Sequence, residues 1–148
     1  MSARHPASRC VFCDIVAGNE KAAVVHRSQA TLTFLDQRPL FPGHCLLVPL
    51  EHHETLPDLP AHLIEPVFAD VHLLARAVQE AMQAEGTLVA INNRVSQSVP
   101  HLHVHIVPRR RKDGLRGFFW PRQPYPDEAA REAVRLAIEQ AIRRLGKA

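Results

Sequence analysis

The sequence predicts an α+β domain with a mainly antiparallel sheet of about five strands, one long central helix and a C-terminal helix. Three observations support this fold class. Short apolar runs are typical of strands, one long segment has apolar residues at helical spacing, and the joins between strands are mostly short, which favours hairpins over crossovers. The chain has 148 residues, the size of one domain, and 46% hydrophobic and 22% charged residues are ordinary for a globular protein.

Short apolar runs bounded by polar residues, prolines or glycines predict the strands. They cover residues 31–35, 45–48, 88–91 and 102–107. The aromatic segment 118–120 is expected to be a short edge strand or a packed loop.

Two segments show the apolar spacing of an amphipathic helix. From about residue 61 to 85, the apolar positions are Ile64, Val67, Phe68, Val71, Leu74, Ala75, Val78 and Met82. Pro66 fits this helix only in its first turn, and Gly86 is expected to end it. A second helix is predicted from an N-cap at Asp127 to about residue 145, with an apolar stripe at Val134, Ile138, Ala141 and Leu145. We expect one domain over residues 1–148, with its core at about 9–122.

Composition limits the classes of function. The net charge of +3 is too small to imply a nucleic-acid partner, although it does not oppose small anionic ligands. No apolar run approaches the roughly 18 residues of a membrane span, and the polar N-terminus does not resemble a secretory signal, so we expect a cytoplasmic protein. Cys10, Cys13 and Cys45 are an odd number of cysteines, which argues against a disulfide framework.

The segment from His101 to Ile106 alternates histidines with aliphatic residues. On a strand, His101, His103 and His105 share one face, and the aliphatic residues between them can pack against the core. Each imidazole has two nitrogens that need partners, so we expect an anion or a metal to face the histidines. The alternatives are solvated histidines, a catalytic three-histidine zinc site, and nucleotidyl transfer in which a neutral imidazole attacks phosphorus. We favour the last.

The segment 96–100 directly precedes the three histidines. Ser96, Gln97 and Ser98 offer two hydroxyls and an amide in a short loop, beside the backbone N–H groups of the segment. Such a loop is a plausible cradle for a phosphate group. Loops of this composition are common, but its position next to the histidines makes it a second observation in favour of phosphate chemistry.

At this point the sequence resembles the histidine triad (HIT) superfamily. The HLHVHIV segment at 101–107 matches the family signature of H-x-H-x-H followed by two apolar residues. Further segments in the same order also resemble the family, at 10–15, 34–36, 42–44 and 48–52. The resemblance implies a HIT-like domain that hydrolyses or transfers at the α-phosphate of a nucleotide through a covalent nucleotidyl-histidine. It also implies a homodimer, and no organic cofactor is expected.

The resemblance implies a role for individual residues. His103 would be the nucleophile, His105 and Ser98 would contact phosphate oxygens, Asn92 would lie near the scissile phosphate, and Asp36 would accept hydrogen bonds from the ribose. The expected substrate-binding residues are Phe12, Ile15 and Leu35 around the base, together with Asp36, Asn92, Ser96, Gln97, Ser98 and Val99. His101, His103 and His105 are the expected catalytic set.

The loop before the histidines departs from the family pattern. Asn92 lies nine residues before His101, Ser96 replaces the usual glycine, and the loop is about two residues shorter. The expected role of Asn92 could therefore belong to Asn93.

Cys10-x-x-Cys13 has the spacing of a zinc-binding pair, although such a pair could also be redox-active or consist of two buried thiols. The resemblance to bacterial relatives implies a structural zinc held by Cys10, Cys13, His52 and His101, with His53 as an alternative ligand. His101 would then be an anchor beside the nucleophile. Cys45 lies in an apolar run and is expected in the core.

The remaining features have less specific interpretations. The basic segment 109–112 is expected to be a solvated loop or an attractor for a polyphosphate tail. His62 and His72 are expected at the surface, and His44 could pack or orient the active site. The favoured function is a nucleotide hydrolase that acts on a purine nucleoside phosphoramidate or a dinucleoside polyphosphate. A zinc hydrolase using the three strand histidines and a nucleotide-binding regulator with little turnover are the alternatives.

Overall fold

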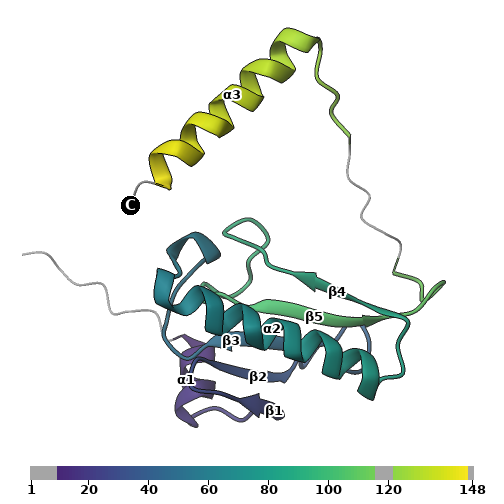
Figure 1. The fold of residues 1–148 in the computed structure, drawn as a ribbon. Coiled ribbons are helices and arrows are strands. Elements are labelled where there is room, and N and C mark those ends of the chain that lie inside the picture. Colours follow the sequence, from purple (N-terminus) through teal and green to yellow (C-terminus); the bar gives the residue numbers. More distant parts are fainter. Residues whose placement is uncertain (1–9, 116–121, 147–148) are drawn as a thin grey trace, which may run out of the picture. The chain divides into compact units, whose positions relative to one another are not determined.

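The computed structural model describes residues 10–115 and 122–146 (Figure 1). The chain divides into two compact units, the first ending at Asp113 and the second beginning at Gly114, and each is described by itself. The segment 118–120, expected to be an edge strand or packed loop, lies outside the described residues. Among the described residues, no helix combines the length and the apolar character needed to cross a membrane.

A five-stranded antiparallel sheet in the order β1-β2-β3-β5-β4 forms the centre of the first unit. The strands are β1 (Val24–Arg27), β2 (Thr31–Leu35), β3 (Cys45–Pro49), β4 (Gly86–Ala90) and β5 (Val104–Arg109). β3 lies in the middle and is buried along its whole length. The observed sheet, with helix α2 across it, confirms the predicted α+β class and the strands expected near residues 31–35, 45–48, 88–91 and 102–107.

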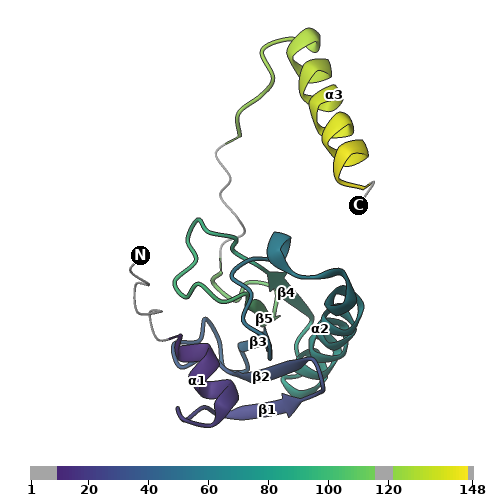
Figure 2. The ribbon, with the colours of Figure 1, turned by 90° about the vertical axis from the view of Figure 1, so that its left-hand side faces the viewer.

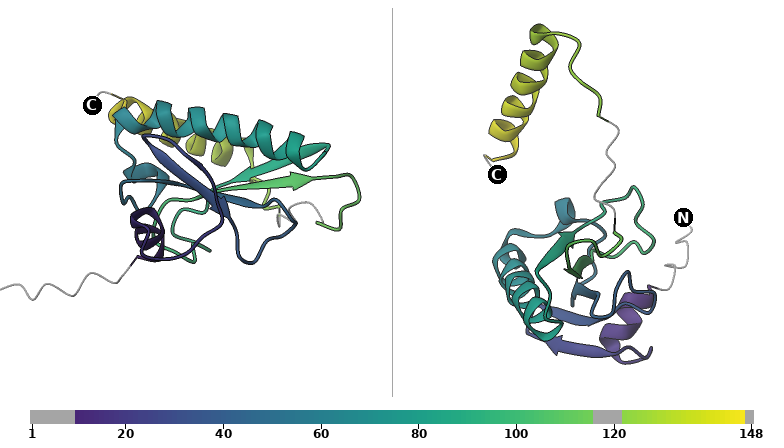
Figure 3. Two further views of the ribbon diagram at one scale, coloured as in Figure 1. Left: turned by 90° about the horizontal axis from the view of Figure 1, so that it is seen from below. Right: turned by 90° about the vertical axis from the view of Figure 1, so that its right-hand side faces the viewer.

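Helices α1 (Val11–Ala17) and α2 (Ala61–Ala81) lie on opposite faces of this sheet (Figures 2 and 3). The α2 face holds one core cluster, in which Val67 and Val71 pack with Leu47 and Ile106. The α1 face holds another, in which Phe12 and Ile15 pack with residues of β2 and β3. Burying both faces of a sheet requires strands that are apolar on both sides, as the continuous run of β3 is.

The histidine segment distributes its side chains between these two faces. Leu102, Val104 and Ile106 belong to the α2 core, so the histidines that alternate with them point toward the α1 face. β5 begins only at Val104, two residues after the predicted start, but the alternation continues back to Leu102. The predicted division between a histidine face and an aliphatic face is therefore confirmed.

The expectation that Pro66 must lie in the first turn of its helix is wrong. α2 begins at Ala61, which places Pro66 inside the helix in its second turn. Proline there removes only one helical hydrogen bond, the one to the carbonyl of residue 62. His62 is solvent-exposed, so water can satisfy this carbonyl. Gly86 also does not end the helix, because α2 ends at Ala81 and Gly86 begins β4.

Besides a single 3-10 turn at Leu56–Asp58, the helix α1 and the strand β1 were not predicted from the sequence. α1 begins at the N-cap Cys10, whose Sγ accepts a hydrogen bond from the backbone N–H of Cys13, and it ends at Gly18 with a φ of 81°. The left-handed conformation at Gly18 is favourable only for a residue without a Cβ. β1 pairs with β2 through an irregular register between Val24 and His26. Both elements are too short to show a clear period in the sequence.

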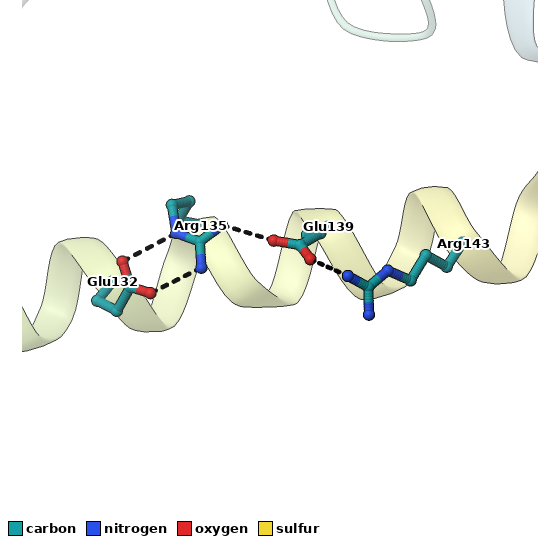
Figure 4. A network of polar contacts seen from close by, with 4 residues as sticks. All are labelled: Glu132, Arg135, Glu139 and Arg143. Carbon is teal, nitrogen blue, oxygen red and sulfur yellow. Dashed lines mark hydrogen bonds and ion pairs between the residues drawn. The ribbon is translucent and has the colours of Figure 1, made fainter.

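The second unit contains helix α3 (Glu128–Leu145), as predicted for residues 127–145. Asp127 is the N-cap and accepts a hydrogen bond from the N–H of Ala130 at 2.7 Å. An ion-pair ladder of Glu132, Arg135, Glu139 and Arg143 follows one side of the helix (Figure 4). Ion pairs at i,i+3 and i,i+4 on an exposed helix are screened by water, so the ladder supports the helix only modestly.

Candidate functional site

A cavity of about 400 Å³ lies on the α1 face of the sheet, where the histidine segment is exposed to it. Its lining consists of Val11, Phe12, Ile15, Glu20, Ala22, Phe34, Leu35, Asp36, Gln37, Arg38, Leu46, Ser98, Val99, His103 and His105. Another cavity of about 390 Å³ lies on the α2 face, but its lining is almost entirely aliphatic and includes none of the three strand histidines. The first cavity is therefore the candidate site.

Eight of the residues predicted from the sequence line this cavity together. They are Phe12, Ile15, Leu35, Asp36, Ser98, Val99, His103 and His105. Asn92, Ser96 and Gln97 do not line it. Gln97 instead stabilises the loop between β4 and the histidines. Its Oε1 accepts a hydrogen bond from the N–H of Arg94 at 2.8 Å, and its Nε2 donates to the carbonyl of Glu54 at 2.6 Å.

The loop between β4 and the histidines is held by side chains as well as by backbone geometry. Asn93 Oδ1 accepts a hydrogen bond from the N–H of Leu56 at 2.8 Å, so this amide is already engaged with the segment before α2. Asn92 is exposed. Arg94 and Ser96 adopt the left-handed backbone region at φ values of 67° and 61°, which tightens the short loop. The residue nearest the cavity in this loop is Ser98.

His103 is held in one tautomer by the backbone. Its Nδ1 lies 2.7 Å from the carbonyl oxygen of His101, so Nδ1–H donates to that oxygen. The lone pair of the neutral ring is therefore on Nε2. The ring is only 4% exposed and lies edge-on to Phe12, with 5.2 Å between ring centroids. This arrangement positions an imidazole at the wall of the cavity, with Nε2 as the nitrogen that could act as a nucleophile.

A fourth histidine, His44, determines which ring nitrogen of His105 carries the proton. The N–H of Leu40 donates to His44 Nδ1 at 3.0 Å, which leaves the proton of the neutral His44 ring on Nε2. Nε2 in turn lies 3.0 Å from His105 Nδ1 and 3.6 Å from a carboxylate oxygen of Asp36. His105 therefore accepts from His44 and carries its own proton on Nε2. The sequence left open whether His44 packs or orients the site, and the contacts show that it does both.

Burial changes the acid–base properties of this pair. Burial, followed by the nearby His103 and His44, lowers the pKa of His105 to about 4. Burial also lowers the pKa of His44, against the opposing influence of Asp36. Both rings are neutral at physiological pH, which fits the hydrogen-bond chain from Leu40 through His44 to His105.

Beside the cavity, Cys10, Cys13, His52 and His101 form a group with one ligand atom from each residue, and all four atoms lie within 4.8 Å of one another. His101 Nδ1 lies 3.4 Å from Cys10 Sγ and 3.2 Å from His52 Nδ1, and Cys13 Sγ lies 3.2 Å from His52 Nδ1. His53, the alternative ligand, instead contacts Glu51 at 3.3 Å. The structure thus brings together the four residues that were predicted as zinc ligands, and His53 is not among them.

The chemistry of this group suits a metal ion. His101 Nε2–H donates to the carbonyl of Pro49 at 3.0 Å, so Nδ1 keeps its lone pair toward the two thiols. Burial lowers the pKa of His101 to about 4, which keeps the ring in the neutral form that binds metals. Burial and the neighbouring Cys10 raise the pKa of Cys13 to about 11, so a bound cation would have to displace this proton.

A second group of possible ligands, Asp36, His44 and His105, also lies within 4.8 Å. Its chemistry is less suitable, because the hydrogen bond from Leu40 to His44 Nδ1 leaves a proton on the Nε2 that would have to bind the metal. The three strand histidines do not form one ligand set among the described residues. His101 and His103 direct their Nδ1 atoms to different partners, the cysteine pair and a backbone carbonyl.

Two further expectations concern residues outside the site. In the basic segment, Arg109 pairs with Asp113 at 2.7 Å and Arg111 with Glu85 at 3.6 Å, so these charges have acidic partners. Arg109 is opposite Gly86 in the sheet, whereas His105 is opposite Ala90, which places the segment at the other end of β5 from His103. Cys45 is buried in the α2 core, as expected.

The lowered pKa of His105 predicts a loss of stability in acid. Its folded pKa is about 4, whereas a histidine in the unfolded chain titrates near its ordinary value of about 6.5. Between these values the unfolded state binds more protons, so the free energy of unfolding should fall as pH drops from about 6.5 to 4. Urea unfolding measured from pH 7.5 to 4.5 should show this slope, and His105→Gln should reduce the slope by roughly 1 kcal/mol per pH unit near pH 5. His72→Gln, on the exposed side of α2, should leave the slope unchanged, and an unchanged slope in His105→Gln would refute the assignment.

Comparison with known proteins places this chain in one family. The HIT domain family matches residues 17–112. Adenosine 5'-monophosphoramidase hnt1 of Schizosaccharomyces pombe is 33% identical over 121 residues, which cover 80% of this chain and 88% of that protein.

Solved structures give the same result. SMU.412c from Streptococcus mutans UA159 superposes with a TM-score of 0.83 at 30% identity, covering 96% of this chain and 90% of that one. A Zn-bound histidine triad family protein from Mycobacterium smegmatis has a TM-score of 0.68 and 35% identity, with 89% and 94% covered. With the HLHVHIV segment facing the cavity, these matches show that the chain belongs to the histidine triad (HIT) family.

Proposed function

We propose that this protein is a nucleotide hydrolase that acts at an α-phosphate through a covalent nucleotidyl-His103 intermediate. The observation that carries the proposal is the hydrogen bond from His103 Nδ1–H to the carbonyl of His101, because it leaves Nε2 as the free nucleophile. The proposed substrates are purine nucleoside phosphoramidates or dinucleoside polyphosphates. The name of the S. pombe relative, an adenosine 5'-monophosphoramidase, supports this class.

In the first step, Nε2 of His103 attacks the α-phosphorus and the bond from phosphorus to the leaving nitrogen or oxygen breaks. The imidazole keeps its Nδ1 proton, and the carbonyl of His101 stabilises the positive charge that develops on the ring. His105 Nε2–H and the hydroxyl of Ser98, which both line the cavity, donate to phosphate oxygens. The leaving group accepts a proton from solvent water as it departs, and the same number of protons returns to solvent when water attacks in the second step.

In the second step, water attacks the phosphorus and the bond from phosphorus to His103 breaks. The products are a nucleoside monophosphate and the regenerated neutral imidazole. Another acceptor in place of water would make the same site a nucleotidyl transferase. Asp36 accepts hydrogen bonds from the ribose, Phe12, Ile15 and Leu35 flank the base, and Asn92 serves the leaving-group side in this proposal.

The group of Cys10, Cys13, His52 and His101 is proposed to hold a structural zinc ion. Two thiolates and two neutral imidazoles are a closed, tetrahedral donor set of the structural kind, and the ion would supply a cross-link rather than an open catalytic position. The cross-link would join the N-terminus of α1 to the histidine segment that precedes and enters β5. The Zn-bound M. smegmatis protein supports the proposal. A zinc hydrolase using the three strand histidines is not favoured, because these histidines have separate partners.

We also propose a cytoplasmic homodimer in which two copies pair along β4. This strand is at the edge of the sheet, and its sequence GTLVA has no charge or proline to discourage pairing. Val89 is 43% exposed although it lies opposite the fully buried Ile106. The other edge, β1, is protected by an irregular register and by Arg27. Edge pairing would continue the sheet into the second copy.

The nucleophile is tested with His103→Ala. Turnover of adenosine and guanosine phosphoramidates and of dinucleoside polyphosphates should fall by a factor of about 10³ or more, because the variant lacks the nitrogen that attacks the phosphorus. Metal content and melting temperature should be retained, and His72→Ala should behave as the wild type. Acid-quench trapping with a phosphorus-labelled substrate should find the labelled intermediate only when His103 is present.

Full activity of His103→Ala would exclude nucleophilic catalysis by this residue. Tight nucleotide binding without turnover across the panel would instead support a regulator.

The zinc site is tested by elemental analysis of the purified protein. One zinc ion per chain is expected, and Cys13→Ala should lose it and lower the melting temperature, because a structural zinc contributes directly to folding. Cys45→Ala is the matched control, since this thiol lies in the α2 core and should not affect the zinc content. Retention of stoichiometric zinc by Cys13→Ala would contradict the proposed ligand set.

The dimer is tested by sedimentation equilibrium. The wild type should be dimeric at micromolar concentration, and Val89→Lys should shift it to monomer by placing a charge on the pairing edge. Val25→Lys on the other edge strand, where Val25 is 50% exposed, should leave the dimer intact. A monomeric wild type, or a dimer unaffected by Val89→Lys, would rule out this interface.

A further inference from the structure

The cavity contains three polar side chains that the proposed mechanism does not use. Glu20, Gln37 and Arg38 line it, and all three residues are exposed. Glu20 follows α1, and its N–H donates to the carbonyl of Asp14 at 3.3 Å. Gln37 and Arg38 follow the end of β2. The two segments are adjacent, because Leu35 N–H donates to the carbonyl of Ala23 at 3.0 Å.

These side chains are available to a ligand. In the described parts of the chain, no hydrogen bond or ion pair engages the side chain of Glu20, Gln37 or Arg38, although the N–H of Arg38 donates to Asp36 at 2.8 Å. By contrast, His105 is hydrogen-bonded to His44, and His103 is hydrogen-bonded to the carbonyl of His101. Free polar groups at the rim of a mainly apolar slot provide specificity for a ligand rather than stability for the core.

The position of the nucleophile determines which part of a nucleotide meets these groups. With the α-phosphate at His103 and Ser98, the base lies in the apolar slot of Phe12, Ile15 and Leu35. The slot continues to Ala22, next to the segment of Glu20. Glu20, Gln37 and Arg38 line the same cavity, so their polar groups are available to the hydrogen-bonding edge of a base in this slot.

A carboxylate discriminates between the two purines because it only accepts hydrogen bonds. Guanine presents two adjacent donors, N1–H and the 2-amino group, which a carboxylate can accept together. Adenine presents the lone pair of N1 at the equivalent position, and this lone pair is repelled by a carboxylate. Guanine O6 and N7 accept hydrogen bonds, and the amide of Gln37 and the guanidinium of Arg38 can donate to them.

We propose that Glu20, assisted by Gln37 and Arg38, selects guanine over adenine, so that the substrate is a guanosine derivative. This inference rests on the proposed function, since it takes the position of the base from the attack of His103 on the α-phosphate. It goes beyond that function by identifying the base and the residue that recognises it.

The test is equilibrium binding of GMP, IMP and AMP to the full-length protein, measured by titration calorimetry. GMP should bind about tenfold more tightly than AMP, a modest ratio for a bidentate contact because Glu20 is solvent-exposed. IMP, which keeps N1–H and O6 but lacks the 2-amino group, should fall between them. In Glu20→Gln, the GMP-to-AMP ratio should drop to near one. Glu65→Gln, an equivalent change on the exposed side of α2, should keep the wild-type ratio.

Wild-type protein that binds AMP as tightly as GMP would overturn the proposal, as would a ratio that Glu20→Gln leaves unchanged. Gln37→Leu is a second variant and should reduce the ratio less than Glu20→Gln does, because it removes a single hydrogen-bonding group. Binding does not require the nucleophile. The base preference is therefore decided even if His103→Ala shows that the catalytic proposal is wrong, and the two failures remain distinguishable.

Discussion

The alternation of side chains between His101 and Ile106 is the constraint on which the rest of the structure depends. The aliphatic members of this segment complete the α2 core, and the histidines are thereby directed to the α1 face. A shift of the register by one residue would place three imidazoles in an apolar core and expose the aliphatic residues, which would be very unfavourable. The same packing that stabilises the domain therefore also positions its functional groups.

Backbone carbonyl and amide groups then make the three histidines chemically different. The carbonyl of Pro49 accepts from His101 Nε2–H, and the carbonyl of His101 accepts from His103 Nδ1–H. The N–H of Leu40 donates to His44 Nδ1, and His44 Nε2–H in turn donates to His105 Nδ1. Each contact determines which ring nitrogen keeps a lone pair. As a result, His101 Nδ1 lies beside the thiols, His103 lines the cavity with its lone pair on Nε2, and His105 accepts from His44 and has a proton to donate.

Helix α1 connects the cysteine–histidine group with the cavity. Its N-cap Cys10 and its residue Cys13 belong to the group with His52 and His101, while Phe12 packs edge-on against the rings of His101 and His103. Because Phe12 also lines the cavity, an ion that holds α1 to the histidine segment would stabilise the wall of the substrate site. The proposed zinc site and the proposed substrate site therefore share helix α1. Glu20, which also lines the cavity, lies in the turn that follows this helix.

The sequence by itself determined the α+β class, the limits of α3, the approximate positions of β2 to β5 and the two faces of the histidine segment. All of these depend on local periodicity or capping, which neighbouring residues specify. Only the tertiary structure revealed the short elements α1 and β1, the internal position of Pro66, the contacts of His44 and the position of Glu20 at the cavity. The tautomers also depended on it, because the contact of His101 with Pro49 joins residues 52 positions apart. Such contacts exist only after the sheet has formed, and no local pattern in the chain encodes them.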